Sequence, residues 1–323
     1  MDRESGTTLC VASTGGHLDE LSRIIRAVTP ATPDVEWVTF DDPQIASSLR
    51  GEVVHFLPYI PPRGYKEIMR AVPLVSALLR SGRYSRIIST GSAIAIPFMA
   101  LARRYRIPCH YVESAARSQG PSATGKVVSA FPWVTSYTQY SGWTSGKWHN
   151  RGSLFDRYEA VERPAAPEQA HRVVVTLGTM RKYGFRSAVE SLALVLPEVL
   201  APGAEVLWQV GVTDTTDLPI AAVDRIPAQE LSAAVQAADL VISHAGVGSA
   251  LTALDAGIGP VLLPRRHFRD EHVDDHQQLI AEELMGRGLA VSRAPAELSA
   301  ENLRESMRIE VVTNESAFHF PLA

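Results

Sequence analysis

A turn of two glycines and a histidine near the start of the chain carries residues that could do acid–base chemistry. Gly15-Gly16-His17 follows a short apolar stretch and precedes a helical pattern over Leu18–Val28. Glycine lets the backbone turn tightly and approach a ligand closely, and histidine can act as a general base near neutral pH. Glu20 lies one helical turn later, where it could orient the imidazole. The alternatives without chemistry are a histidine that caps the helix and a solvated carboxylate in the first turn.

Two further turns in the first half carry polar residues directly after apolar stretches. Thr90 and Gly91 end one such stretch, and their turn could offer backbone amides to an anion or could be a plain tight turn. Glu113 ends the next stretch, with Arg117 just beyond it. A carboxylate at this edge could bind sugar hydroxyls or act as a base, and an ion pair between Glu113 and Arg117 is the structural alternative.

The second half has two glycine turns of its own, both placed after apolar stretches. Gly178 and Thr179 form the first, and Gly246, Gly248 and Ser249 form a GxGS turn that precedes a helical pattern. Backbone amides and hydroxyls in such turns can bind phosphate. A GxG pattern alone is weak evidence, but GxGS between strand and helix, beside a second glycine turn, predicts a wall that faces phosphate.

Charged and histidine residues gather just before and within the next helical pattern. Arg265 and Arg266 could pair with a phosphate or an acidic sugar, or could be ordinary surface residues. His272 and His276 are four residues apart, as in some metal sites. The third ligand is not fixed, and the chain has no Asp-x-Asp pair, so we expect no metal. We expect instead that sugar hydroxyls are bound by Asp275, His276 and Gln277.

Short apolar runs alternate with helical patterns along the whole chain, which predicts an α/β fold with parallel sheets. The length of 323 residues suits two domains. The alternation pauses over a run with two prolines, so we predict domains at 1–160 and 172–323 joined by a linker at 161–171. Ligands of parallel sheets bind beyond the carboxyl ends of the strands. Two facing domains would therefore form one cleft with a site on each wall.

Composition narrows the class of protein further. The net charge of −4 argues against a nucleic-acid binder. Cys10 and Cys109 lie in apolar runs without metal spacing, which is typical of buried free thiols in a reducing compartment. The N-terminus has no apolar signal core, and the longest uncharged stretch is too short for a membrane span. We therefore expect a cytoplasmic protein without a transmembrane anchor.

The motifs resemble, in order, those of a known enzyme family. The first half is similar to the membrane-side subunit of the eukaryotic dolichol-linked N-acetylglucosaminyltransferase and to bacterial exopolysaccharide homologues. The second half is similar to the catalytic subunit of that enzyme and to capsule-type bacterial members, and more distantly to lipid II synthases of the MurG type. The matching stretches are 14–20, 88–91, 111–117, 122–126, 139–140, 175–179, 243–249, 259–266 and 271–277.

The resemblance implies a family 28-type GT-B glycosyltransferase with two facing Rossmann-like domains. It implies that the second half binds a UDP-sugar and that the first half binds the acceptor, a polyprenyl-diphosphate-linked sugar in exopolysaccharide or cell-envelope glycan synthesis. We expect transfer of a hexose, N-acetylhexosamine or uronic acid with inversion, without metal or cofactor. His17 would be the base, with Glu20 or Glu113 assisting. Thr252 stands where many relatives carry a glutamate that holds the ribose, with Asp255 one turn further.

The site residues follow from the motifs and the resemblance together. The acceptor-binding residues are Gly15, Gly16, Thr90, Gly91 and Arg117. The donor-binding residues are Gly178, Thr179, Ile226, His244, Gly246, Val247, Gly248, Ser249, Thr252, Arg265, Asp275, His276 and Gln277.

Three other functions remain compatible with the sequence: a glycosyltransferase for a soluble natural product, a nucleotide-sugar epimerase, and a non-catalytic partner subunit. One segment of the first half could contact the membrane that carries the acceptor. It consists of a proline-rich loop at Pro58–Pro62 and a basic, apolar helical pattern from Lys66 to Arg83. Such a helix can lie on an anionic membrane surface, although an amphipathic helix that packs on the core is the commoner outcome. With the family resemblance, we expect peripheral contact with the inner face of the cell membrane.

Overall fold

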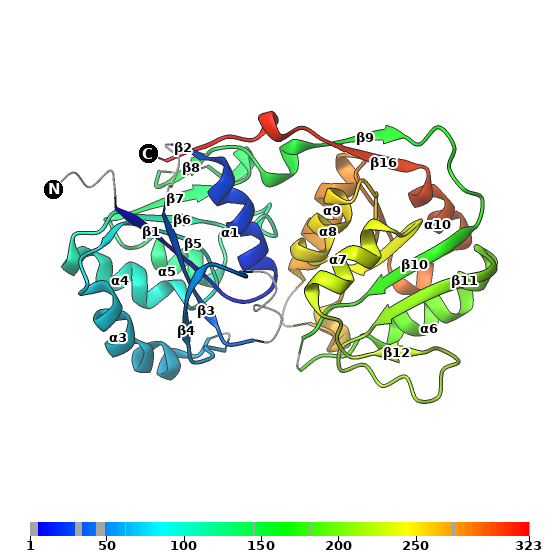
Figure 1. Ribbon diagram of the computed structural model, residues 1–323, viewed down its shortest axis with the longest axis horizontal. Helices are drawn as coiled ribbons and strands as arrows, with labels where there is room; N and C mark the ends of the chain where they lie inside the picture. Colours follow the sequence, from blue (N-terminus) through cyan, green and yellow to red (C-terminus); the bar gives the residue numbers. More distant parts are fainter. Residues whose placement is uncertain are drawn as a thin grey trace. The chain divides into compact units, whose positions relative to one another are not determined.

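The computed structural model describes residues 6–29, 34–42, 49–61, 63–144, 146–180, 182–272 and 275–322 (Figure 1). The chain divides into two compact units. The first comprises Met1–Asp156 and Ser316–Ala323, and the second comprises Arg157–Glu315.

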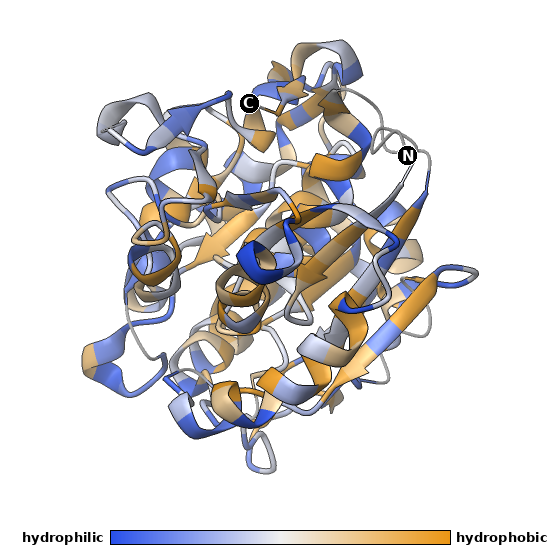
Figure 2. Ribbon diagram, turned by 90° about the vertical axis from the view of Figure 1, so that its left-hand side faces the viewer, coloured by the Kyte–Doolittle hydropathy of each residue, from blue (hydrophilic) through white to orange (hydrophobic). Residues whose placement is uncertain are grey.

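The first unit is built on a parallel sheet of seven strands in the order β4-β3-β1-β5-β6-β7-β8. The strands are β1 (Thr7–Ala12), β3 (Val35–Phe40), β4 (Val53–Leu57), β5 (Tyr84–Gly91), β6 (Cys109–Val112), β7 (Val134–Thr138) and β8 (Trp148–Asn150). Their near-continuous apolar runs are typical of strands buried on both faces. In Figure 2 the strands are largely hydrophobic, whereas many of the turns are hydrophilic.

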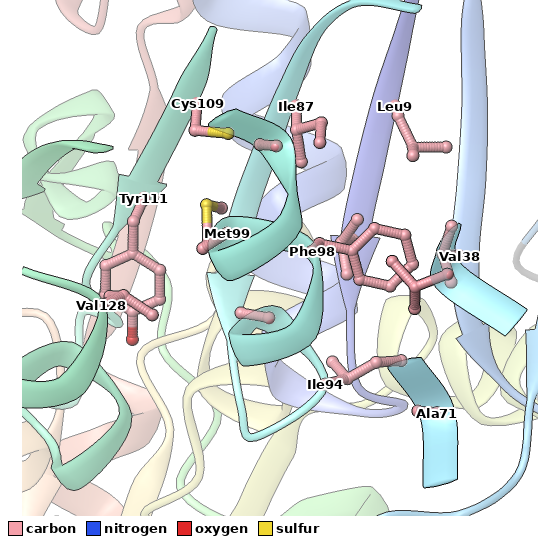
Figure 3. Close-up of a cluster of buried hydrophobic side chains, with 14 of the residues drawn as sticks. Leu9, Val38, Ala71, Ile87, Ile94, Phe98, Met99, Cys109, Tyr111 and Val128 are labelled. Carbon is pink, nitrogen blue, oxygen red and sulfur yellow. The ribbon is translucent and has the colours of Figure 1, made fainter. Parts of the chain in front are cut away.

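Helices cover both faces of this sheet (Figure 1). Helix α1 (Gly16–Ala27) lies on one face, and α3 (Tyr65–Leu79), α4 (Ala95–Tyr105) and α5 (Ala123–Val128) lie on the other. The buried residues Leu18, Leu21 and Ile24 recur on α1 at the spacing of a single helix face. Figure 3 shows Phe98 and Met99 of α4 packed over the apolar side chains of β1 and β5.

The second unit repeats this architecture with six parallel strands in the order β12-β11-β10-β13-β14-β15. They are β10 (Ala170–Thr176), β11 (Leu200–Gln209), β12 (Ala222–Val223), β13 (Leu240–His244), β14 (Val261–Leu263) and β15 (Val291–Ser292). Val173 and Val175 face one apolar cluster and Val174 faces another, as the alternation of a strand requires. The first cluster includes α6 (Arg186–Val195) and α10 (Ala300–Met307). The second includes residues of α7 (Ala228–Gln236) and α8 (Val247–Asp255).

The α/β class with parallel sheets is as predicted, but the linker and the last predicted helix are not. Strand β9 (Tyr158–Glu162) runs into the expected linker and pairs antiparallel with β16 (Ile309–Thr313), inside the second unit. The sequence pattern predicts a helix over Glu301–Val311, whereas α10 ends at Met307. The β-branched run from Ile309 to Thr313 favours a strand, which explains the difference. Helix α9 (His276–Gly286) is predicted to begin near Val273, which lies outside the described residues.

The end of the chain returns to the first unit, which also differs from the predicted domain at 172–323. Strand β17 (Phe320–Pro321) pairs with β2 (Val28–Thr29). Phe320 is fully buried, and its ring makes an edge contact with Tyr137 at a centroid distance of 5.1 Å. Buried aromatic area of this kind strongly stabilises a core, so the last residues belong to the first unit. In the described part of the chain, no helix is both long and apolar enough to span a membrane.

Candidate active site

His17 lies where β1, β5 and β6 end, at the carboxyl edge of the first sheet. Gly15 precedes α1 with a φ of 80°, a conformation that favours glycine. The Thr90 hydroxyl donates to the carbonyl of His17 at 2.7 Å. A Cβ atom placed on Gly91 would lie 3.4 Å from both His17 Cε1 and the hydroxyl of Tyr111. The structure therefore brings the predicted turns together. It also places Tyr111 beside them, a residue of the matching motif for which the sequence predicted no role.

Glu20 is buried beneath this edge, with 1% of its surface exposed. Its carboxylate accepts hydrogen bonds from the Ser114 hydroxyl at 2.6 Å, the Ala115 amide at 2.9 Å and the Gln139 side chain at 3.3 Å. Burial raises the pKa of Glu20 to about 7, although these hydrogen bonds oppose the shift. Glu20 therefore connects α1 to the loop after β6, and its role in orienting His17 stays a prediction.

Glu113 is equally buried and connects β6 to α5. It accepts hydrogen bonds from the amide and hydroxyl of Ser122 at 2.8 and 3.1 Å, from the Ser114 amide at 3.2 Å and from the Tyr111 hydroxyl at 3.3 Å. Burial raises its pKa, whereas these amides and the charge of Arg117 act in the opposite direction. A side chain on Gly125 would overlap the carboxylate. Glu113 thus positions the 114–122 loop, which leaves His17 as the candidate base.

Gln139 completes the buried network, and the sequence marked it only as part of a motif. Its amide nitrogen donates to the Glu113 carbonyl at 3.1 Å, and its oxygen accepts from the Leu154 amide at 2.9 Å. Ser114, Ser122 and Gln139 have small or common polar side chains, and only their long-range partners reveal their place. The stretches that match the family motifs contain all three residues, but the local sequence does not show which group each of them binds.

In the second unit, His244 lies against two glycine turns. A Cβ on Gly178 would lie 2.9 Å from two atoms of the imidazole, and one on Gly246 would overlap it. The ring contacts the Thr176 carbonyl at 3.4 Å through Nδ1. Burial and the nearby charge of Arg265 lower the pKa of His244 to about 3, so the imidazole is neutral at physiological pH. Because Nδ1 donates the single N–H of the neutral ring to the Thr176 carbonyl, Nε2 is left as a hydrogen-bond acceptor.

Helix α8 presents unsatisfied amides beside His244. Gly246 precedes the helix without a side-chain cap, and the first intrahelical bond runs from the Ala250 amide to the Gly246 carbonyl. The amides of Val247, Gly248 and Ser249 therefore have no acceptor within the helix. Amides at a helix start form a binding site for anions, which agrees with the predicted phosphate-facing wall.

Arg265 has a different place from the one predicted. Its guanidinium is 1% exposed and donates to the carbonyls of Leu177 at 2.7 Å, Tyr183 and Gly184 at 2.9 Å, and Glu271 at 3.0 Å. Burial lowers its pKa to about 10, so it stays charged at neutral pH. The side chain supports the loop after Gly178 from below and is not free to reach a phosphate directly.

Two of the other residues predicted to bind the donor sugar, Asp275 and Gln277, form hydrogen bonds to backbone amides of the loop after β14. The Gln277 oxygen accepts from the Arg265 amide at 3.0 Å, and Asp275 accepts from the His267 amide at 2.9 Å. The His276 ring contacts His272 edge-on at 4.6 Å. Among the residues that the structure describes, no group of three histidine, cysteine or acidic side chains could hold a metal.

Thr252 and Asp255 of α8 are the residues that the sequence relates to binding of the nucleotide ribose. The Thr252 hydroxyl donates to the Gly248 carbonyl one turn earlier at 2.9 Å. Asp255, the alternative carboxylate, accepts a hydrogen bond from the Tyr158 hydroxyl on β9. The Ile226 amide donates to Gln209 at 2.8 Å, which in turn donates to the Thr176 hydroxyl. Asp255 is therefore occupied in holding β9 rather than placed to bind a ribose.

The arrangement matches known proteins along most of the chain. Residues 172–317 match the glycosyltransferase family 28 C-terminal domain. The UDP-N-acetylglucosamine–N-acetylmuramyl-(pentapeptide) pyrophosphoryl-undecaprenol N-acetylglucosamine transferase of Xanthomonas euvesicatoria pv. vesicatoria is 29% identical over 318 residues, which cover 88% of this chain and 68% of the relative.

Solved structures give the same fold at low identity. Acinetobacter baumannii MurG has a TM-score of 0.57 with 16% identity, over 98% of this chain and 96% of that one. The glycosyltransferase SnogD from Streptomyces nogalater has a TM-score of 0.56 with 18% identity, over 94% and 91%. The chain thus has the GT-B fold, and the family 28 match of its second unit indicates a glycosyltransferase. Its second unit is similar to the family 28 C-terminal domain, and the chain resembles MurG.

The buried carboxyl of Glu20 makes the stability of the first unit depend on pH. Its pKa is higher in the folded protein than the ordinary value of 4.5, so its contribution to stability is complete below that value and is lost as the pH rises through about 7. A shift of this size corresponds to about 3 kcal/mol. We expect Glu20→Gln to flatten the fall in the free energy of unfolding between pH 5 and pH 8, measured by chemical denaturation. Glu205→Gln, at an exposed carboxyl, should keep the original slope, and an unchanged slope in Glu20→Gln would contradict the assignment.

Proposed function

We propose that this enzyme transfers a hexose, N-acetylhexosamine or uronic acid from a UDP-sugar to a hydroxyl of a polyprenyl-diphosphate-linked sugar. The family 28 match covers the second unit, and the Xanthomonas relative is named for transfer from UDP-N-acetylglucosamine to a pyrophosphoryl-undecaprenol acceptor. The observation that carries the proposal is the row of unsatisfied amides at the start of α8, beside the neutral His244. We place the reaction in exopolysaccharide or cell-envelope glycan synthesis.

The donor site stabilises the charge that develops on the leaving diphosphate. As the bond to the anomeric carbon breaks, negative charge grows on the phosphate oxygen. The amides of Val247, Gly248 and Ser249 are already oriented, as is the Gly178 turn, so little reorganisation is needed. Buried Arg265 adds positive potential from behind the loop. These groups supply, without a metal ion, the stabilisation that a cation gives in other sugar transferases.

His17 acts as the general base in this proposal. It removes the proton from the acceptor hydroxyl while the hydroxyl oxygen attacks the anomeric carbon, and UDP leaves with inversion. His17 is half-buried at the start of α1, where the first turn of the helix can also face the acceptor's diphosphate. Thr90, Gly91 and Tyr111 fix its backbone and surroundings.

Replacement of His17 by alanine tests this role. General-base help is worth about 10²–10⁴ in rate, so we expect the turnover number to fall by about that factor while the affinity for UDP is unchanged. Turnover is measured with radiolabelled UDP-sugars and a short-chain prenyl-diphosphate-linked sugar, and UDP binding by calorimetry. His171→Ala, at an exposed histidine of β10, is the matched control. Full activity in His17→Ala would remove this residue from the mechanism, and conversion of the UDP-sugar without acceptor would indicate an epimerase.

A surface of the first unit fits contact with the membrane that would carry the acceptor. Ile68, Ala71 and Val75 bury one face of α3, yet apolar side chains also project from its outer side. Tyr65 is 70% exposed and Met69 is 68% exposed. Leu74 of the same helix is also exposed, as are Phe56 on β4 and Tyr59 in the loop after it. Exposed cations in this segment include Arg63, Lys66 and Arg70. Apolar residues flanked by cations suit the boundary of an anionic bilayer, so we place the enzyme at the inner face of the cell membrane.

Sedimentation with phospholipid vesicles tests this surface. We expect the chain to sediment with vesicles rich in phosphatidylglycerol, and the double variant Tyr65→Ser, Met69→Ser to lose most of that binding. Leu194→Ser is the control, because Leu194 is 78% exposed on α6 of the second unit and should leave binding unchanged. Wild-type protein that stays in solution, or an equal loss in the control, would contradict the proposal.

A further inference from the structure

Trp143 is a half-buried aromatic residue at the ligand-binding edge of the first sheet. It ends the short 3₁₀ helix η2 (Ser141–Trp143), which follows the carboxyl end of β7 by way of Gln139 and Tyr140. Parallel sheets bind their ligands at this edge. The chemistry of the proposed transfer does not itself require an indole at this position.

The indole of Trp143 is held in a fixed orientation. Its N–H donates to the carbonyl of Arg117 at 3.0 Å. Its ring meets the buried Trp148 in an edge contact, with the centroids 5.1 Å apart and the planes at 65°. Because this contact is T-shaped, the two rings are not stacked face to face. A side chain that is both partly exposed and fixed can bind a ligand without losing much conformational entropy.

A row of aromatic rings connects Trp143 to the buried carboxylate of the site. Trp148 makes a second edge contact with Tyr111, at 6.2 Å. One atom of the Trp148 ring lies 3.2 Å from the point that a Cβ on Gly125 would occupy, and the Glu113 carboxylate lies against that same point. Trp143 therefore stands at the outer end of a packed series that reaches the loop positioned by Glu113.

Trp133 has similar local chemistry at the opposite edge of the sheet. It is also half-buried, and its N–H donates to the Met99 carbonyl at 2.8 Å. Its ring stacks on Phe131 at 5.2 Å with planes 10° apart, and the Arg103 guanidinium lies 5.2 Å from its centre. Trp133 precedes β7, so it lies at the amino ends of the strands. Both rings pack on the apolar core of the first unit, but Trp133 is stacked face to face on Phe131, whereas the ring contact of Trp143 is T-shaped and lies at the ligand-binding edge.

We propose that Trp143 forms a platform for a sugar ring of the acceptor. This inference rests on the proposed function, because it assigns part of the acceptor that the first unit would bind. One face of a pyranose ring carries C–H groups and little hydroxyl, and it packs well against the flat, apolar surface of an indole. A large rigid aromatic side chain supplies this contact area at low entropic cost. The platform would thus recognise the carbohydrate rather than the diphosphate or the lipid.

Calorimetric titration with paired probes tests the platform. The probes are farnesyl diphosphate and its glucosyl, galactosyl, N-acetylglucosaminyl and glucuronosyl derivatives. We expect wild-type protein to bind at least one sugar-linked probe more tightly than farnesyl diphosphate. Trp143→Leu should weaken binding of that probe by about tenfold or more, a typical loss for an aromatic contact, and should leave farnesyl diphosphate unchanged. Trp143→Phe should retain part of the preference, and Trp133→Leu should retain all of it.

Three results would overturn the inference: no sugar-linked probe preferred by the wild type, an undiminished preference in Trp143→Leu, or an equal loss in Trp133→Leu. Transfer assays with the same probes separate this result from the proposed function. We expect Trp143→Leu to raise the KM for the acceptor while kcat is largely kept. If the enzyme transfers sugar but does not prefer sugar-linked probes, the role of Trp143 is contradicted and the proposed function stands. If no sugar is transferred between any donor and acceptor, the proposed function itself is contradicted.

Discussion

The structure depends on ionisable side chains that are buried at the carboxyl ends of its two sheets. A buried charge is costly unless hydrogen bonds replace the water that it has lost. Glu20 and Glu113 receive amide and hydroxyl donors from the loops after β6 and at α5, and Arg265 donates to four backbone carbonyls. Each charge can be satisfied only if its loop keeps one conformation. The loops that would face the substrates are therefore fixed from below.

This arrangement separates residues that hold the site from residues that would react. His17, Gly248 and Ser249 are partly exposed, whereas Glu20, Glu113 and Arg265 are buried beneath the loops. Groups that are oriented before the reaction cost no reorganisation as charge develops, which is the main source of catalysis in many enzymes. Burial, and then the nearby positive charge of Arg265, lower the pKa of His244 and keep its imidazole neutral.

The sequence was sufficient to predict the parallel sheets and the glycine turns that follow their strands, because strands and turns leave local patterns. It could not show which partner satisfies a buried charge, since those partners are distant in the chain. Ser114 is 94 residues from Glu20, and Leu177 is 88 residues from Arg265. For the same reason the sequence suggested Arg265 as a phosphate ligand. The return of Phe320 to the first unit likewise depends on a core formed by residues from elsewhere in the chain.

The proposed reaction requires that the second unit bind the nucleotide of the donor through the backbone amides of its glycine turns, without a metal. The most direct test is calorimetric titration of the purified chain with UDP, GDP and dTDP, each in the presence of EDTA and then of Mg²⁺. We predict saturable binding of UDP, tighter than that of the other two nucleotides, with the same affinity in EDTA as in Mg²⁺. Absence of UDP binding, or binding that requires the metal, would contradict this donor site.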